Sequence, residues 1–317
     1  MNLHALLIAP FGVCLAAAAH AAGSPAESIT FRFAPLDGGS YVQRVDITRS
    51  KNLAARATQI DESSTRTRVS TYKTESGWRV VHEPISAVAR RNGQTVTNPI
   101  VDLLSKTVVT YRLDGDGHIQ HVDGYVRLIE RLREQLPAEM VEKLEQVLSV
   151  ESLEAKDKAE WDSRFGDFIG LTVEVGESIA ASAPFVLPDG TTIMYRVTTR
   201  FVRFEPCGEA RCVRVEQVYD SQADAVAQLS ERVAGELVED IAALPPPADA
   251  RRQATTGSIT GKVSRLVDPS TMLIHREEVE RVMRMTVNLP QQGSVPLDMS
   301  ERRVYQLEFP ARAAQPE

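Results

Sequence analysis

The sequence predicts an α+β fold, in which a large curved antiparallel sheet, an open or half β-barrel, is covered by several amphipathic helices. Three observations indicate this. Alternating polar and apolar residues, rich in Val, Ile, Thr and aromatic side chains, recur near both ends of the 317-residue chain. In two intervening stretches the apolar spacing changes to the period of a helix. Between these stretches, residues 195–220 have the pattern of a hairpin with a cysteine on each side of its turn.

Residues 28–98 are expected to form antiparallel strands. Polar and apolar residues alternate through 29–33, 44–48 and 78–83, and Trp78, Val80 and His82 would share one face of a strand. Gly-containing dipeptides separate these runs and mark turns. Residues 108–113 and 119–122 read as the next hairpin, closed by the Asp-Gly-Asp-Gly stretch at 114–117.

Residues 124–169 read as a helical insert. The first predicted helix carries one apolar stripe, and a second begins at Pro137. A third runs through 154–165 and includes Trp161. After strands and the central hairpin, residues 223–244 form a further amphipathic pattern, which three prolines end. The expected organisation is a signal peptide at 1–21, a β-rich domain at 22–245, a connector at 246–256, C-terminal strands at 257–310 that complete the same sheet, and a loose tail at 311–317.

The central hairpin brings Cys207 and Cys212 to opposite sides of a short loop. Pro206 should stop the first strand because it cannot donate to a strand ladder, and Gly208 permits the turn. Opposed residues of paired strands lie roughly 4.5–5.5 Å apart at Cα, within the reach of a disulfide. We therefore predict a Cys207–Cys212 bridge. A redox pair or half of a metal site are the alternatives, although redox dithiols usually have two intervening residues and no second cysteine pair completes a zinc site.

The first residues predict export. No Asp, Glu, Lys or Arg precedes Glu27, and an apolar core at 6–19 is followed by an Ala-His-Ala cleavage pattern. No Lys or Arg lies near Met1, which departs from the usual signal. A buried N-terminal helix and a lipid anchor on Cys14 are the alternatives. Export implies a periplasmic or secreted protein, in which an even pair of cysteines is bridged, and no stable transmembrane segment is expected after processing.

Composition excludes one class of partner. The formal charge is −7, and nucleic-acid binding needs clustered positive charge, so no nucleic acid is expected as a partner. The G-S-I-T-G-K-V stretch at 257–263 is one residue too short for a phosphate loop and lacks its hydroxyl and helix. No nucleophile elbow, zinc-protease pair or dinucleotide turn is present, so we expect no cofactor and favour a binding protein over an enzyme.

The sequence holds three candidate sites, two for a metal ion and one for an apolar ligand. The stretch at 114–117 resembles part of a calcium loop, but its spacing suits a turn better. His118 and His121 would point to opposite faces of a strand and are not expected to share an ion; the remaining His82 and His275 are read as structural or solvated. Apolar side chains that could line a groove, because methionine adapts to varied shapes, are Met272, Met283, Met285 and Trp161.

The Gly-Gly-Ser-Tyr entry at 38–41, the hairpin at 113–124, the approach at 173–177 and the terminal block at 257–268 together carry a resemblance. The chain resembles an uncharacterised family of exported bacterial proteins of unknown function, which in turn look like the open β-barrels of the LolA/LolB lipoprotein carriers. The resemblance implies a curved antiparallel sheet covered by helices, with an apolar groove. It supplies no catalytic motif, so no functional residue transfers.

The function expected from these observations is a periplasmic binding or carrier module for a lipid, an apolar small molecule or a lipidated partner. The alternatives are an envelope module that acts through protein contacts without a small ligand, and a hydrolase with a carboxylate pair that the sequence does not reveal.

Overall fold

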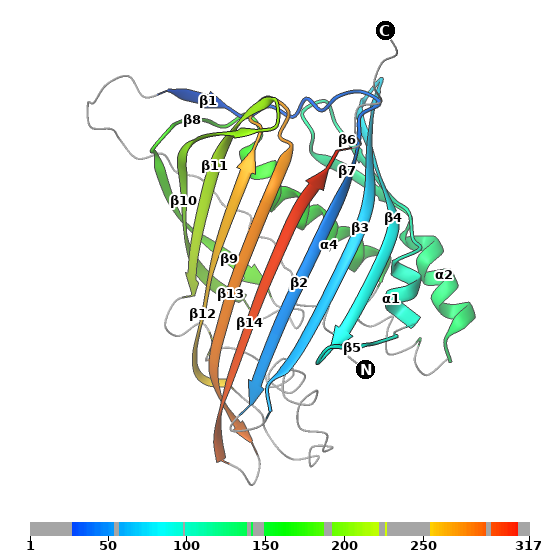
Figure 1. The fold of residues 1–317 in the computed structure, drawn as a ribbon, viewed down its shortest axis with the longest axis vertical. Coiled ribbons are helices and arrows are strands. Elements are labelled where there is room, and N and C mark those ends of the chain that lie inside the picture. The colour runs from blue at the N-terminus through cyan, green and yellow to red at the C-terminus, as the bar shows by residue number, and fades with distance from the viewer. Residues whose placement is uncertain are drawn as a thin grey trace.

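The segments that alternate between apolar and polar residues form long strands. The computed structural model describes residues 27–309, except for 54–56, 98, 138–140, 142–148, 187–191, 222–225, 227–253 and 290–292. Within these residues a twelve-stranded antiparallel sheet is formed (Figure 1). Across it lie, in order, β7 (Ile119–Asp123), β6 (Val109–Leu113), β4 (Gly77–Arg91), β3 (Gln59–Thr74), β2 (Ser40–Leu53), β14 (Gly293–Glu308), β13 (Ile274–Leu289), β12 (Ala254–Val267), β11 (Ala210–Ser221), β10 (Thr192–Cys207) and β9 (Ser178–Val186), with β5 (Gln94–Thr95) paired to β4.

The two ends of the chain meet in the middle of this sheet. β14 pairs with β2, so that Tyr305 lies opposite Val45, and β12 to β14 fill the space between β2 and β11. The strand order is linear, and no pairing of β7 with β9 joins the two edges among the described residues. The sheet is therefore open.

Among the described residues the helices cover only part of the sheet, so the expectation of a sheet covered by several helices is met only in part. Figure 1 shows α4 (Val150–Arg164) behind the centre of the sheet, and α1 (Pro99–Leu104) and α2 (Tyr125–Gln135) beside β4 at one edge. The helices expected at 137–148 and 223–244 lie outside the described residues apart from a few positions. Within the described part of the chain, no helix is long and apolar enough to cross a lipid bilayer.

The helix α4 begins earlier than the sequence pattern indicates. Ser149 precedes it in an extended conformation, and its side chain accepts a hydrogen bond from the Ser152 backbone N–H at 3.1 Å. Such a cap satisfies one of the donors that the first turn of a helix leaves free. The helix ends near Arg164, and the short 3-10 helix η1 (Gly166–Phe168) follows.

The segment before β2 crosses one end of the sheet instead of joining it. Only β1 (Ser28–Thr30) is a strand, and it pairs with β8 (Thr172–Glu174) in a separate two-stranded sheet. The Phe31 N–H then donates to the Leu171 carbonyl at 3.0 Å, and the Arg32 N–H to the Pro269 carbonyl at 2.8 Å. The segment thus joins the helical insert to the β12–β13 turn at that end (Figure 1).

The central hairpin is present and its disulfide connects Cys207 with Cys212, with 5.8 Å between the two Cα atoms. The expectation that Pro206 stops the strand is wrong, because Pro206 pairs with Arg211 and β10 continues to Cys207. The turn holds only two residues, with Gly208 at a φ of 69°. Because Cys207 lies opposite Ala210, the bridge runs diagonally instead of joining directly opposed residues.

We call the face of the sheet on which α4 packs the inner face. Odd-numbered side chains of β2, β13 and β14 lie on it, as the two contacts of α4 with Glu277 and Tyr305 show. One apolar cluster lies between the sheet edge at β4, β6 and β7 and the helices α2 and α4. A second lies between the hairpin, η1 and the residues around Phe31. The space between these clusters holds the site.

Candidate functional site: a cavity between the sheet and α4

A cavity of about 690 Å³ lies between the inner face and α4. It is bounded by the start of β2, by β3, β4 and β6, by the C-terminal half of α4, and by two turns of the opposite half of the sheet. Its aromatic lining consists of Phe33, Tyr41, Tyr111, Trp161, Phe165 and Phe309. A cavity of this size whose wall is more apolar than polar is typical of small-molecule sites.

The aromatic wall is held in place by contacts between its own rings. The ring centroid of Trp161 lies 5.7 Å from those of Phe33 and Tyr111, in edge-to-face geometry, and 4.5 Å from that of Phe165. The Trp161 indole N–H donates to the Gly117 carbonyl at 2.8 Å. Because the indole nitrogen has this partner, the rest of the ring is free to present an apolar surface.

A polar stripe of α4 faces the same cavity. Asp157, Glu160 and Arg164 follow helical spacing and line the wall together with Trp161. Tyr111 donates from its hydroxyl to Asp157 Oδ2 at 3.0 Å, and the Tyr125 hydroxyl donates to the same oxygen. Burial raises the pKa of the Asp157 carboxyl above its ordinary value, although both hydroxyls oppose that shift.

The other two charged residues of the stripe are tied to the sheet. Glu160 Oε1 accepts from the Tyr305 hydroxyl at 3.2 Å. The Arg164 guanidinium lies 4.3 Å from the centroid of the Tyr305 ring, and its Nε lies 3.4 Å from Glu277 Oε1. Glu277 also pairs with Arg265. The positive charge of Arg164 is therefore matched by a carboxylate that lies deeper in the sheet.

Two histidines that sequence analysis treated as isolated lie in the cavity wall. His82 packs against Tyr111, with ring centroids 4.7 Å apart, and His275 packs against Phe309 at 5.4 Å. Burial, and secondarily the charge of Arg164, lowers the pKa of His82 to about 4. Burial also lowers the pKa of His275, although the charge of Asp268 opposes the shift. Both imidazoles are therefore neutral at neutral pH.

Two nitrogen atoms of the wall lack hydrogen-bond partners. His82 Nε2 and Arg164 Nε are both buried, and neither makes a hydrogen bond among the described residues, although Glu277 Oε1 lies near Arg164 Nε as an ion pair. Most buried polar atoms in proteins are paired, so an orphaned one calls for an explanation, such as a ligand.

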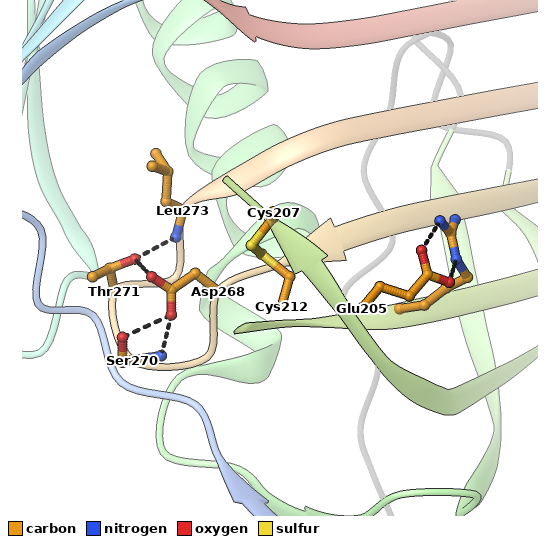
Figure 2. The surroundings of a disulfide bond; sticks show 8 residues. Glu205, Cys207, Cys212, Asp268, Ser270, Thr271 and Leu273 are labelled. Atoms are coloured by element: carbon orange, nitrogen blue, oxygen red, sulfur yellow. Dashed lines mark hydrogen bonds and ion pairs between the residues drawn. A yellow bond between two sulfur atoms is a disulfide. The ribbon is translucent and has the colours of Figure 1, made fainter. Parts of the chain in front are cut away.

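The disulfide hairpin and the β12–β13 turn form the remaining wall. Cys207 and Gly208 line the cavity beside Asp268 and Met272. Figure 2 shows the Asp268 carboxylate accepting hydrogen bonds from Ser270 and Thr271, next to the bridge. These bonds fix the turn in which Met272 has a φ of 63°, a conformation uncommon for a residue with a side chain.

The four residues predicted to line an apolar groove are separated by the structure. Trp161 and Met272 lie in the cavity wall, whereas Met283 and Met285 do not line it. Both of the latter are buried further along β13. Met283 is nine residues beyond Ile274 at the start of that strand, which corresponds to roughly 30 Å of extended chain.

The candidate metal motifs have structural roles. Asp114 Oδ1 accepts from the backbone N–H groups of Asp116, Gly117 and His118 at 2.9–3.1 Å, so this carboxylate closes a turn as the spacing indicated. His121 is exposed and pairs with Asp123. Among the described residues, the ligand atoms of Cys207, Cys212 and His275 gather within 4.8 Å, but both sulfurs are joined in the disulfide.

Comparisons with known proteins give no family. No family model matches the chain, and no curated protein matches it. A structure of lipovitellin that describes lipid–protein interactions has 10% sequence identity, a TM-score of 0.41 and a match covering 89% of this chain and 26% of that one. A protein assigned as a lipoprotein from Parabacteroides distasonis has 11% identity and a TM-score of 0.25, with 89% and 98% covered. Both likenesses are too weak to define a ligand, and membership of the exported family stays a prediction.

Sequence reasoning missed most of the site. Asp157, Glu160 and Arg164 were not singled out, and His82 was read as structural or solvated. A signal was present: these charges recur at helical spacing around Trp161, on the side that must face the protein.

Proposed function

We propose that the chain is an exported binding or carrier module that holds an apolar or amphiphilic ligand in the cavity between the inner face and α4. The observation that carries this proposal is the wall itself. Six aromatic side chains are among the residues that line a cavity of about 690 Å³, and polar groups are positioned among them, as in sites that bind a drug-sized ligand.

Apolar residues at the rim support a route into the cavity. Leu36 and Phe309 line it, yet they are 78% and 52% exposed. The ring centroids of Phe309 and Tyr41 lie 6.3 Å apart. Exposed apolar side chains beside the cavity suit the entry of an apolar chain.

A periplasmic or secreted location belongs to the same proposal. The Cys207–Cys212 disulfide is stable in an oxidising compartment, and the predicted signal at 1–21 lies outside the described residues. The cysteine that lines the cavity is held in the disulfide, so it offers no free thiol as a nucleophile.

The test uses protein purified from the periplasm of an expressing bacterium. Native mass spectrometry should show a bound mass of lipid size, which organic extraction removes. Protein that is repeatedly empty, in both native spectra and extracts, contradicts the proposal. In that case, pull-down from envelope extract and a broad esterase and glycosidase screen would test the protein-contact and hydrolase alternatives.

The two tryptophans can report where the ligand lies. Trp161 lines the cavity and Trp78 does not, and the chain has no other tryptophan. In the Trp78→Phe variant, adding extracted lipid to emptied protein should shift or quench the fluorescence of Trp161. In the matched Trp161→Phe variant, the emission of Trp78 should stay nearly constant. A response from Trp78 alone would place the ligand elsewhere.

A further inference from the structure

Negatively charged groups outnumber positively charged ones in the cavity wall. Among the described residues, the carboxylates that line it are Asp157, Glu160, Glu209 and Asp268, and the cation is Arg164. Arg164 already lies beside Glu277, and both wall histidines are neutral at neutral pH. An anionic head group would therefore meet more negative than positive charge, and like charges repel strongly in a partly desolvated site.

The same wall nevertheless offers hydrogen bonds. His82 Nε2 and Arg164 Nε are buried and make no hydrogen bond among the described residues, although Arg164 Nε lies 3.4 Å from Glu277 Oε1. The wall also holds the Asp157 carboxylate, which accepts hydrogen bonds from the Tyr111 and Tyr125 hydroxyls at Oδ2 and is an acceptor for a further donor. A group that both accepts and donates matches this combination, and a hydroxyl is the simplest neutral group that does both.

The aromatic side chains of the wall offer an apolar surface on which a hydrocarbon chain can pack. The rings of Phe33, Trp161 and Phe165 lie within reach of the polar stripe because they pack around the same turns of α4. A volume of about 690 Å³ is in the range for one drug-sized ligand and is small for a bulky multi-chain lipid.

We propose that the cavity selects a neutral, single-chain amphiphile whose hydroxyl-bearing head group lies among His82, Asp157, Glu160 and Arg164, and whose chain packs on the aromatic wall. This rests on the proposed binding function and adds to it the charge of the head group. The carboxylates of α4 exclude anionic head groups because they repel negative charge.

The test compares three probes with the same chain length on emptied mature protein, at a pH where a fatty acid is ionised. The probes are 1-monooleoylglycerol, oleate and 1-octadecene, which has no polar head. We expect monooleoylglycerol to bind about tenfold or more tighter than oleate, a difference of about 1.4 kcal/mol. Competition for the fluorescence response of Trp161 in the Trp78→Phe protein measures each affinity.

The Glu160→Gln variant separates charge from shape. Its amide oxygen still accepts from the Tyr305 hydroxyl, but one negative charge is removed from the wall. We expect oleate to bind about tenfold tighter than it binds the parent protein, and monooleoylglycerol to change by less than about threefold. Glu280→Gln, an exposed position on the other face of β13, is the matched control and should change neither affinity. If thermal unfolding shows that Glu160→Gln is not folded, Asp157→Asn replaces it, because its amide oxygen can still accept from both tyrosines.

The outcomes are distinguishable. Oleate binding as tightly as monooleoylglycerol, or a Glu160→Gln variant that leaves their ratio unchanged, overturns the head-group inference while the cavity keeps its proposed function. Failure of all three probes, 1-octadecene included, to bind the emptied protein overturns the proposed function and this inference with it.

Discussion

Gly261 on β12 occupies a position where a side chain has no room. A Cβ added there would lie 2.0 Å from Cζ of the Tyr219 ring, which folds over the glycine. In that position the Tyr219 hydroxyl accepts a hydrogen bond from Arg281 Nε at 3.1 Å. The missing side chain therefore allows a tyrosine of one strand to reach an arginine two strands away.

We predict that Gly261→Ala lowers the free energy of unfolding by about 1–3 kcal/mol, because the Tyr219 ring must leave its place or the strands must separate. Urea denaturation measures the change. Gly115→Ala is the matched control: nothing lies within 4 Å of the added Cβ, so its effect should stay within about 0.5 kcal/mol. Equal effects of the two substitutions would show that the tyrosine packing does not depend on the glycine.

The hairpin of β10 and β11 is the element that sequence reasoning described best. Its strands, turn and disulfide depend on residues within a few positions of each other, and all three are present. The sequence did not indicate that the tip of the hairpin contributes to the cavity. In the structure, Cys207 and Gly208 form part of the cavity wall.

We predict that the Cys207→Ser/Cys212→Ser double variant loses about 2 kcal/mol of stability, the value expected for a bridge that closes so short a loop. Chemical denaturation of the oxidised parent and the variant measures it, and adding a reductant to both should abolish the difference. Thiol labelling of unreduced, unfolded parent protein should find no reactive sulfur; stoichiometric labelling would contradict the bridge.

At the scale of the whole molecule, one row of charges crosses the inner face. Direct strand pairing places Arg281, Glu301, Arg49, Asp61 and Arg91 side by side on five successive strands from β13 to β4. Arg49 contacts Glu301 at 2.6 Å and Arg91 contacts Asp61 at 2.7 Å. Because neighbouring strands pair these charges with each other, this part of the inner face satisfies its own charged groups within the sheet.

Glu301, a member of this row, has three positively charged neighbours. Burial alone would raise its pKa, but the charges of Arg303, Arg49 and Arg281 together lower it below its ordinary value. A carboxyl with a lowered folded-state pKa contributes stability that is complete above its unfolded pKa and is lost as the pH falls through the folded pKa.

We predict that Glu301→Gln costs about 3 kcal/mol at neutral pH, because it leaves buried cations without their counter-charge. The difference from the parent should shrink as the pH falls below about 4.5, where the unfolded glutamate begins to bind a proton. Glu83→Gln removes an exposed pair with Arg68, whose side chains are 51% and 52% exposed, and should cost at most about 1 kcal/mol. A Glu301→Gln effect no larger than that of Glu83→Gln would contradict the coupling of the row.

The sequence by itself determined the strands, the central hairpin and its bridge, because side-chain alternation and turn chemistry act over a few residues. Only the tertiary structure decided which faces meet. Glu160 and Tyr305 are separated by 145 residues, and Arg164 meets Glu277 through the same docking of α4 on the inner face. Periodicity shows that a residue lies on the buried side of an element but not which distant element it contacts, so the cavity, its histidines and its charge balance could not be predicted from the sequence.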